Sequence, residues 1–328
     1  MSRLQALKSA LVALALARLA LDALRAARWA ARQLALTRGG ADLLSRYAGG
    51  NRAWAVVTGG AKGVGRGLSR MLAKRGFSVL MLGRDRAELA AQSAAVAREF
   101  GVESAWVATD VSSAFLDDAS ARALLREIEA AVRGEDIAVL ACIAGDSDLA
   151  RHLTDKPLSR NRALLHLNCL GTLGSIQLLM PRLVQRPCRS AIITCGALTA
   201  VQGGTPGFAT SSANKSYIRA LSNAISREYE GQVDVICAHP LAVESNILKA
   251  SKSVYGAISA DDFAEGVLSR LGRDTPVRET FGTPLHELLA LLSLARPMGL
   301  DSVASFADIL DRPVDLAPIH DKLKLGDL

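Results

Sequence analysis

Apolar residues gather in short runs that alternate with longer stretches of helical spacing through most of the chain. Each run is short for a helix and is bounded by polar or glycine-containing segments, as expected for buried strands. The intervening stretches repeat Leu and Ala at helical intervals, which predicts helices. The runs that predict strands are residues 53–57, 78–82, 106–109, 137–142, 191–195 and 233–238. Together these elements predict one large α/β domain.

Two further helices are predicted after the last of these strands, over residues 261–271 and 284–294. The first has the pattern of a surface helix. The second is rich in leucine, and we expect it either to cover a substrate opening or to contact a membrane. The domain is predicted to span residues 51–275, followed by a helical C-terminal extension over residues 276–328.

Residues 1–38 form a separate segment that is rich in Ala, Leu and Arg and contains Asp22 as its only acid. On a helix, six of its charged side chains fall on one face roughly 120° wide, and Lys8 lies at the margin of that face. The six are Arg3, Arg18, Asp22, Arg25, Arg28 and Arg32. Its longest uncharged run, residues 9–17, is shorter than the roughly 20 residues that cross a bilayer. An amphipathic helix on a membrane surface, a mitochondrial presequence and a helix packed on the protein all fit this composition. The following glycines mark a linker, so residues 1–50 are set apart from the domain.

Composition and charge exclude some classes of function. With 50% hydrophobic residues the chain can bury a large core. Its net charge of +7 is concentrated in the N-terminal segment, and no basic block is interleaved with aromatic residues. We therefore expect no nucleic-acid partner, and a membrane surface or an anionic cofactor accounts for the charge better. The five cysteines form no C-x-x-C motif, which predicts a reducing compartment and no metal site.

The first predicted strand leads into the run Thr58-Gly59-Gly60-Ala61-Lys62-Gly63-Val64-Gly65. In such a turn, Gly59 allows the sharp exit from the strand and Gly63 lets the backbone approach a diphosphate closely. Gly65 lets the next helix, expected over residues 66–74, pack closely on the sheet. The free N–H groups and positive dipole end of that helix then face the phosphates. The spacing Thr-Gly-x-x-x-Gly-x-Gly is more specific than a lone glycine-rich match.

With this spacing the sequence resembles the short-chain dehydrogenase/reductase family. Its opening Trp-Ala-Val-Val-Thr-Gly is most similar to the branch of membrane-bound 17β-hydroxysteroid dehydrogenases and very-long-chain 3-ketoacyl-CoA reductases. The resemblance covers residues 54–247 and continues more weakly to residue 272. It implies a Rossmann-type, doubly wound parallel sheet and an oxidoreductase that acts on a lipid-like carbonyl, an acyl-CoA or a steroid. The related enzymes carry an N-terminal anchor in the endoplasmic reticulum, which favours that membrane over the mitochondrion for residues 1–38, and a homodimer is expected by analogy.

The resemblance also predicts which nicotinamide cofactor is bound. An NAD-selective site usually has an acid at the end of the second strand, where this chain has Gly83 followed by Arg84. Lys62 lies in the phosphate turn nearby, and two cations without an acid favour the additional phosphate of NADP(H). Arg84 as a solvated loop residue is the alternative. Asp85 and Glu88 predict a capping box for the next helix.

Other positions of the family's cofactor site are matched in part. Asp110 and Val111 follow the third strand and correspond to the pair that contacts adenine. After the fourth strand the family has Asn-Asn-x-Gly, whereas this chain has Cys142-Ile143-Ala144-Gly145. Gly145 is kept and both asparagines are absent, which predicts a looser edge of the site. The loop expected to contact the nicotinamide amide is represented by its proline, its valine and a hydroxyl: Pro240, Val243 and Ser245.

The catalytic residues of the family are matched less well. Asn168 corresponds to its asparagine and Lys215 to its lysine, but Ser211 occupies the position of its tyrosine. The family's serine lies thirteen residues before that tyrosine, where this chain has Leu198, while anchoring on the fifth strand gives Cys195. Residues 146–162 between these elements are expected to be irregular.

The loss of the tyrosine leaves the proton donor open. A phenol begins near a pKa of about 10, and a neighbouring lysine lowers it toward working pH. A serine hydroxyl is a far weaker acid and lies closer to the backbone. Three substitutes are conceivable: a water relay from Lys215 through Ser211, the thiol of Cys195, and Tyr217, which we expect to be core packing because it lies about 120° round the helix from Ser211.

Two functions follow. The first is an NADPH-dependent reductase of 3-ketoacyl-CoA or steroid substrates at a membrane, with a degraded catalytic tetrad. The second is a catalytically silent member that binds NADP(H) and serves as a scaffold or regulatory partner.

Overall fold

The computed structural model describes residues 40–147, 151–244, 257–273 and 278–295, together with isolated positions before residue 40. The chain divides into two units, Met1–Gly40 and Ala41–Leu328. In the first unit the described positions, Arg18 and Leu21 among them, are helical and exposed. A helix was expected there, and its relation to a membrane remains a prediction.

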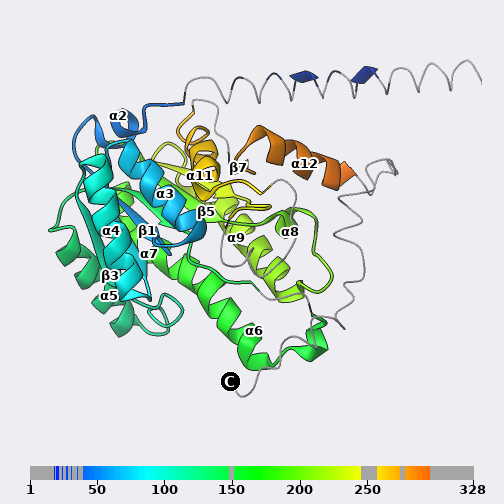
Figure 1. Ribbon diagram of the computed structural model, residues 1–328, viewed down its shortest axis with the longest axis horizontal. Helices are drawn as coiled ribbons and strands as arrows, with labels where there is room; N and C mark the ends of the chain where they lie inside the picture. The colour runs from blue at the N-terminus through cyan, green and yellow to red at the C-terminus, as the bar shows by residue number, and fades with distance from the viewer. Residues whose placement is uncertain are drawn as a thin grey trace, which may run out of the picture. The chain divides into compact units, whose positions relative to one another are not determined.

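The second unit contains one parallel sheet of seven strands in the order β3-β2-β1-β4-β5-β6-β7 (Figure 1). This confirms the α/β, doubly wound fold. Two strands begin and end as predicted, β4 (Ile137–Cys142) and β6 (Val233–Ala238). Four other strands begin or end one or two residues from their predicted bounds. They are β1 (Trp54–Thr58), β2 (Ser78–Gly83), β3 (Ser104–Ala108) and β5 (Ser190–Cys195). The sequence did not predict β7, which has only two residues, Glu279–Thr280.

Helices cover both faces of the sheet and bury two apolar layers. One layer lies beneath α3 (Gly63–Lys74), α4 (Arg86–Phe100) and α11 (Ala260–Leu268), and includes Leu68, Leu89, Phe263 and the strand residue Val57. The other lies beneath α5 (Asp118–Ala131), α7 (Gly171–Val184) and α9 (Ala209–Glu228), and includes Ile128, Leu179, Ile225 and Leu140. The predicted surface helix α11 therefore buries one of its faces.

Short helices complete the described chain. Before the sheet, α2 (Leu43–Ala48) begins at Asp42, whose carboxylate caps Ser45, and it ends at Gly49 in the left-handed conformation. After β5 comes α8 (Leu198–Val201), and α12 (Pro284–Ala295) matches the predicted leucine-rich helix.

The region expected to be irregular, residues 146–162, is helical in part, so that prediction was wrong over its second half. It contains a 3₁₀ turn, η1 (Leu153–Asp155), and the beginning of α6 (Leu158–Leu165). Pro157 stands at the N-cap of α6, where its missing N–H costs nothing.

A continuous helix runs from α6 through a π-helical turn, η2 (His166–Leu170), into α7. Counted as one element, Leu158–Val184, it is the single helix of the described residues with the length and hydropathy to cross a membrane. Half of its most apolar window is buried inside the protein, as in a core helix.

Candidate active site

The turn between β1 and α3 has the backbone geometry that the glycines predicted. Gly63 has a φ of 51°, in the left-handed region that favours glycine. A Cβ on Gly65 would lie 2.1 Å from the carbonyl oxygen of Gly59, so no side chain fits there. The helix begins at Gly63, three residues earlier than expected, with no side chain of the described residues capping its first turn. Its first N–H groups are therefore free to meet an anion, and Val64 lies half-buried among them.

Thr58 joins this turn to the end of β4. Its hydroxyl oxygen accepts hydrogen bonds from the backbone N–H groups of Ile143 and Ala144, at 2.9 and 3.0 Å. These bonds hold the backbone at the edge where the asparagines are absent, and the looser edge expected there remains a prediction. The buried side chains of Cys142 and Ile143 occupy the two positions without needing polar partners.

The two cations that are predicted to favour the additional phosphate of NADP(H), Lys62 and Arg84, each face a carboxylate. Lys62 lies 3.1 Å from Asp85, and Arg84 lies 4.0 Å from Asp110. Asp85 also accepts from the backbone N–H of Glu88, which confirms the Asp85 half of the predicted capping box, while the Glu88 side chain accepts from Gln92 instead. That bond and the nearby ammonium hold the pKa of Asp85 below its usual value. Because Arg84 is 73% exposed, its loose pairing leaves the guanidinium accessible to a phosphate.

Asp110 and Val111 follow β3 directly, as the resemblance implies. The Asp110 carboxylate accepts from the backbone N–H of Ser112 at 2.9 Å, while Val111 is buried. The carboxyl ends of β1, β2 and β3 thus place Thr58, Arg84 and Asp110 along one edge of the sheet.

Gly145, Asn168 and Lys215 converge on the loop after β4. A Cβ on Gly145 would lie 2.7 Å from the Asn168 side-chain oxygen and 3.4 Å from the Lys215 Nζ atom. Asn168 is fully buried in the π-helical turn, and its amide both donates to and accepts from the backbone of Asp146, at 2.9 and 3.2 Å. The π turn, which sequence reasoning did not predict, carries this amide toward the loop.

Lys215 and Ser211 lie one turn apart on α9. The ammonium of Lys215 donates to the backbone carbonyl of Cys195 at 2.7 Å. Ser211 is buried, and its hydroxyl accepts from that of Ser147 at 3.2 Å. Ser147 was not singled out from the sequence, because only the fold brings the loop after β4 against α9. The pair places two hydroxyls where the resemblance implies a phenol.

Cys195 reaches this region mainly through its backbone. Its thiol is partly buried at the end of β5, and burial raises its pKa although Lys215 opposes the shift. A raised pKa makes the thiol less suited to supply a thiolate, but it does not remove its proton. Its carbonyl is the group that meets Lys215.

Leu198, which lies thirteen residues before Ser211, packs among other apolar side chains. Leu198 opens α8 and packs with Phe281 and Ala290, with Val201 and Leu241 at the margin of this cluster. The nearby hydroxyl of Thr194 is no substitute, because it is buried against Ser222 of α9 at 2.7 Å. The described residues packed against Leu198 are therefore apolar.

Tyr217 is not core packing, as the sequence analysis expected, but lies 39% exposed on α9. The helical offset of about 120° from Ser211 holds, but that face of α9 meets solvent at this level rather than another layer. The loop after β6 is described only in part: Val243 is buried and Pro240 half-buried, whereas Ser245 lies outside the described residues.

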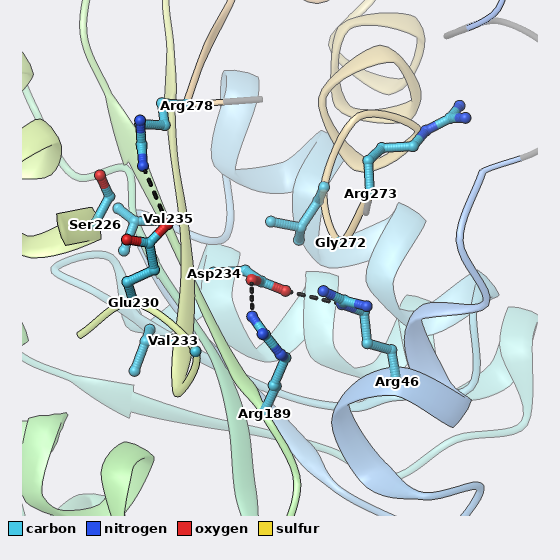
Figure 2. A pocket seen from close by; sticks show the side chains of 12 residues that line it. Arg46, Arg189, Ser226, Glu230, Val233, Asp234, Val235, Gly272, Arg273 and Arg278 are labelled. Carbon is cyan, nitrogen blue, oxygen red and sulfur yellow. Dashed lines mark hydrogen bonds and ion pairs between the residues drawn. The ribbon is translucent and has the colours of Figure 1, made fainter. Parts of the chain in front are cut away.

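A pocket of about 370 Å³ lies elsewhere, at the amino ends of β5 and β6 (Figure 2). Three of the arginines that line it are paired with carboxylates: Arg46 and Arg189 both bond Asp234 at 2.8 Å, and Arg278 lies 3.5 Å from Glu230. Because the sheet is parallel, this pocket opens on the edge opposite the glycine turn. It is not the candidate cofactor site.

The sequence is similar to those of known proteins. The family model described as short chain dehydrogenase matches residues 53–255, more than half of the chain. Among curated proteins, a very-long-chain 3-oxoacyl-CoA reductase of Aspergillus fumigatus is 29% identical over 265 residues, which cover 77% of this chain and 74% of that protein. The protein of the same name from Bos taurus is 27% identical, over 75% of this chain and 76% of its own length.

Solved structures share the fold at lower identity. A 7β-hydroxysteroid dehydrogenase has a TM-score of 0.64 at 19% identity, covering 80% of this chain and 95% of its own. A short-chain dehydrogenase from Sphingobium yanoikuyae in complex with NADPH has a TM-score of 0.62 at 20% identity, with coverages of 75% and 94%.

Proposed function

The chain belongs to the short-chain dehydrogenase family, and on that premise we propose that it is an NADP(H)-binding oxidoreductase of lipid-like carbonyls. The turn from Thr58 to Gly65 is the single observation that carries the proposal. It combines an uncapped helix N-terminus with a backbone approach that leaves no space for a Cβ. Thr58, Lys62, the glycines and Val64 would hold the diphosphate, with Asp110, Val111 and Gly145 farther along the same edge.

NADP(H) rather than NAD(H) is supported by Arg84 and Lys62. Both are exposed cations at the end of the site where the adenosine ribose is expected, and the related Sphingobium structure contains NADPH. When bound, the cofactor supplies the hydride. The residues of this chain orient it and handle the proton.

The substrate class is inferred from the relatives and from the apolar side chains packed against Leu198. The relatives named above are very-long-chain 3-oxoacyl-CoA reductases. The apolar cluster of Leu198, Phe281 and Ala290 is chemically suited to a hydrocarbon chain or a steroid. We infer a 3-ketoacyl-CoA or steroid substrate, presented at a membrane, with the endoplasmic reticulum favoured over the mitochondrion.

The proton would travel by a route that contains no phenol. With Ser211 at the tyrosine position, the hydroxyls of Ser211 and Ser147 form a pair that water can extend toward Lys215. Lys215 would supply the proton, the hydroxyls would pass it on, and Asn168 would hold the Asp146 loop in place. We propose this relay in preference to Cys195, whose pKa is raised by burial.

A silent NADP(H)-binding scaffold is the second candidate, and the arrangement of the same groups favours it. Lys215 already donates one hydrogen bond to the Cys195 carbonyl, and Ser211 already pairs with Ser147, so both groups are partly engaged within the protein. General acid catalysis contributes roughly 10² to 10⁴ in rate, which a silent member would lack.

The test is NADPH oxidation by the full-length protein with a long-chain 3-ketoacyl-CoA, comparing wild type with Ser211→Tyr. Turnover by wild type that is lost in Ser147→Ala supports the reductase and the relay. Turnover by Ser211→Tyr alone identifies a silenced reductase with an intact cofactor site.

Cofactor binding is tested separately by thermal stabilisation with NADPH. Gly63→Asp should abolish the stabilisation, because it adds a charge and a side chain at a left-handed position in the turn. Gly134→Asp is the matched control, since Gly134 has a φ of 70° and open space around it. Absence of any NADPH effect on wild type would contradict the proposed function.

A further inference from the structure

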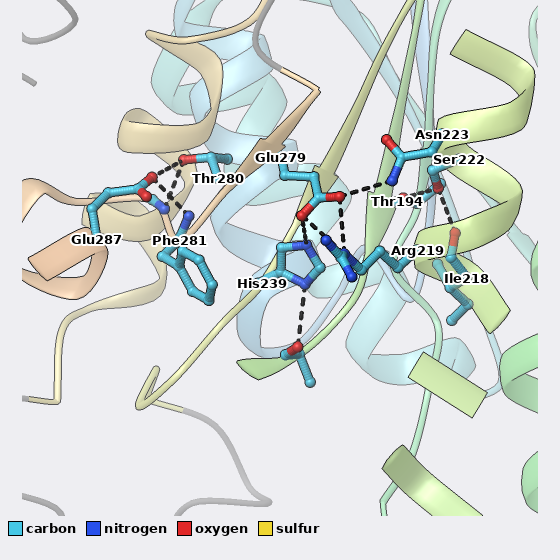
Figure 3. Close-up of polar contacts among 12 residues, drawn as sticks. Thr194, Ile218, Arg219, Ser222, Asn223, His239, Glu279, Thr280, Phe281 and Glu287 are labelled. Carbon is cyan, nitrogen blue, oxygen red and sulfur yellow. Dashed lines mark hydrogen bonds and ion pairs between the residues drawn. The ribbon is translucent and has the colours of Figure 1, made fainter. Parts of the chain in front are cut away.

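Glu279 on β7 lies at the centre of a group of polar side chains from three elements (Figure 3). Arg219 of α9 donates to both of its carboxylate oxygens, at 2.9 and 3.0 Å. Asn223, one turn farther along α9, donates to one of them at 2.8 Å. One carboxylate at the sheet edge therefore holds two successive turns of the helix that carries Lys215.

The same carboxylate faces His239, the last residue before Pro240. The His239 Nε2 atom lies 3.5 Å from Glu279, and the ring is fully buried and packs against Phe281 at 5.3 Å between centroids. The other ring nitrogen, Nδ1, lies 3.2 Å from the carbonyl oxygen of Ala197. An imidazolium would donate from Nδ1 to the loop after β5 and would form an ion pair with the carboxylate at Nε2.

The loop after β5 is pressed against this ring. A Cβ on Gly196 would lie 2.3 Å from His239 Nδ1, so the backbone approaches as closely as glycine permits. Cys195 comes directly before Gly196, and its carbonyl accepts the Lys215 ammonium. The hydrogen bond between Lys215 and the Cys195 carbonyl thus joins α9 to the start of this loop. Glu279 contacts α9 directly and contacts the loop through His239.

We propose that Glu279 is a positioning residue for Lys215: through Arg219 and Asn223 it holds α9, through His239 it holds the Cys195–Ala197 loop, and it thereby sets where the ammonium lies. The role of Lys215 itself rests on the proposed function. Glu279 touches neither the candidate cofactor site nor the reacting groups. No sequence motif singled it out, since β7 has two residues and pairs only along its edge of the sheet.

The charges around His239 support a protonated ring. Glu279 faces it from β7, the Cys237 thiol from β6, and Arg219 of α9 reaches it only across the carboxylate. Glu287 of α12 bonds the other side of β7, at Thr280 and the N–H of Phe281. Burial alone would lower the pKa of His239, but the neighbouring Cys237 thiol and Glu279 carboxylate outweigh it and raise the pKa to about 9.

The first test is a double-mutant cycle of Glu279→Gln and Lys215→Met, read by urea unfolding of the full chain. If Glu279 positions Lys215, the double variant loses less stability than the two single losses added together. The matched control is Glu265→Gln, which removes a bidentate carboxylate–arginine pair, with Arg75, on the α11 side of the sheet. Its cycle with Lys215→Met should be additive, and additivity in the Glu279 cycle would overturn the proposal.

Two features keep this test decisive. If Glu279→Gln does not fold, Asn223→Ala removes only one helix contact and replaces it in the cycle. The cycle needs no cofactor, so failure of wild type to bind NADPH would count against the proposed function and leave the positioning result standing.

The second test is NADPH affinity as a function of pH. We expect Glu279→Gln to raise the Kd about tenfold, as for the loss of one charge-assisted contact, and Glu265→Gln to leave it unchanged. We also expect wild-type affinity to weaken as the pH rises through about 9, where His239 loses its proton. In Glu279→Gln this weakening should move to lower pH, because His239 loses its proton more easily without the carboxylate. A Kd and pH profile identical to those of wild type would contradict the positioning role.

Discussion

The glycine turn and the region proposed for proton transfer lie at the same carboxyl edge of the sheet but are constructed differently. The turn works through backbone: a left-handed Gly63, a Gly65 without room for a Cβ, and the uncapped first turn of α3. The second region works through side chains, those of Asn168, Ser211 and Lys215. A site made of backbone N–H groups tolerates changes in the surrounding side chains, whereas a proton donor disappears with a single residue.

Thr58 connects the two regions. It ends the strand that leads into the turn, and it bonds the loop that continues through Gly145 to Asp146. Asn168 then holds Asp146 from the other side. The proton-transfer region has therefore kept its framework although the phenol is absent, which is why restoring a tyrosine at Ser211 is an informative experiment.

The largest effect is expected from Gly65→Ala, which attacks the turn. The new methyl group would lie 2.1 Å from the Gly59 carbonyl oxygen, so the turn or the helix must move. We expect complete loss of NADPH-induced thermal stabilisation, together with destabilisation of about 3 kcal/mol from overpacking. Gly134→Ala, in open space at a φ of 70°, should cost about 1 kcal/mol for the left-handed conformation alone and keep the NADPH response. A normal NADPH response in Gly65→Ala would show that the turn is not the phosphate site.

The turn, which is made of backbone groups, could be predicted from the sequence more fully than the region made of side chains. Glycine spacing specifies backbone geometry locally, so the turn was predicted residue by residue, apart from the earlier start of α3. The strands β4 and β6 were predicted to the residue because their apolar runs are buried on both faces. The two-residue β7 has no pattern of its own and depends on pairing with β6.

Contacts made across the fold could not be predicted. Nothing in the sequence shows that Lys215 meets a backbone carbonyl of β5, or that Ser147 lies against Ser211. Tyr217 was misplaced for a related reason: helical periodicity gives its angle on α9, but only the packing of neighbouring elements decides which angles are buried.

The next largest effect concerns the framework behind the proton-transfer region and is a pH dependence of stability. His239 has a pKa raised to about 9 in the folded state, against about 6.5 when unfolded. Its contribution is therefore fully present below about pH 6.5 and is lost as the pH rises through about 9, by at most about 3 kcal/mol. Urea unfolding between pH 6 and 10 measures this loss. His239→Gln, which cannot titrate, should flatten that part of the curve, and an unchanged slope would assign the loss to other groups.

A smaller effect is expected where the two regions are joined. Thr58→Val keeps the shape of the side chain but leaves the N–H groups of Ile143 and Ala144 without their acceptor. We expect destabilisation of about 2 kcal/mol, because buried donors lose their partner. Thr154→Val, at an exposed position, should change the free energy of unfolding by less than about 0.5 kcal/mol. Equal stability of the two variants would mean that Thr58 does not hold the regions together.

The smallest effect concerns Arg84, which is predicted to select NADP(H). It tests whether a side chain near the glycine turn contributes to cofactor affinity. Arg84→Gln removes an exposed guanidinium whose loose pairing with Asp110 stabilises the fold little. We expect affinity for NADPH to fall about tenfold while affinity for NADH stays the same, because only NADPH carries the additional phosphate. Isothermal titration with both cofactors measures the ratio, and Arg122→Gln, which removes an exposed arginine from an i,i+4 pair on α5, is the control. If both cofactors lost affinity equally, Arg84 would contribute general charge rather than selectivity, and discrimination would have to come from Lys62 or from backbone alone.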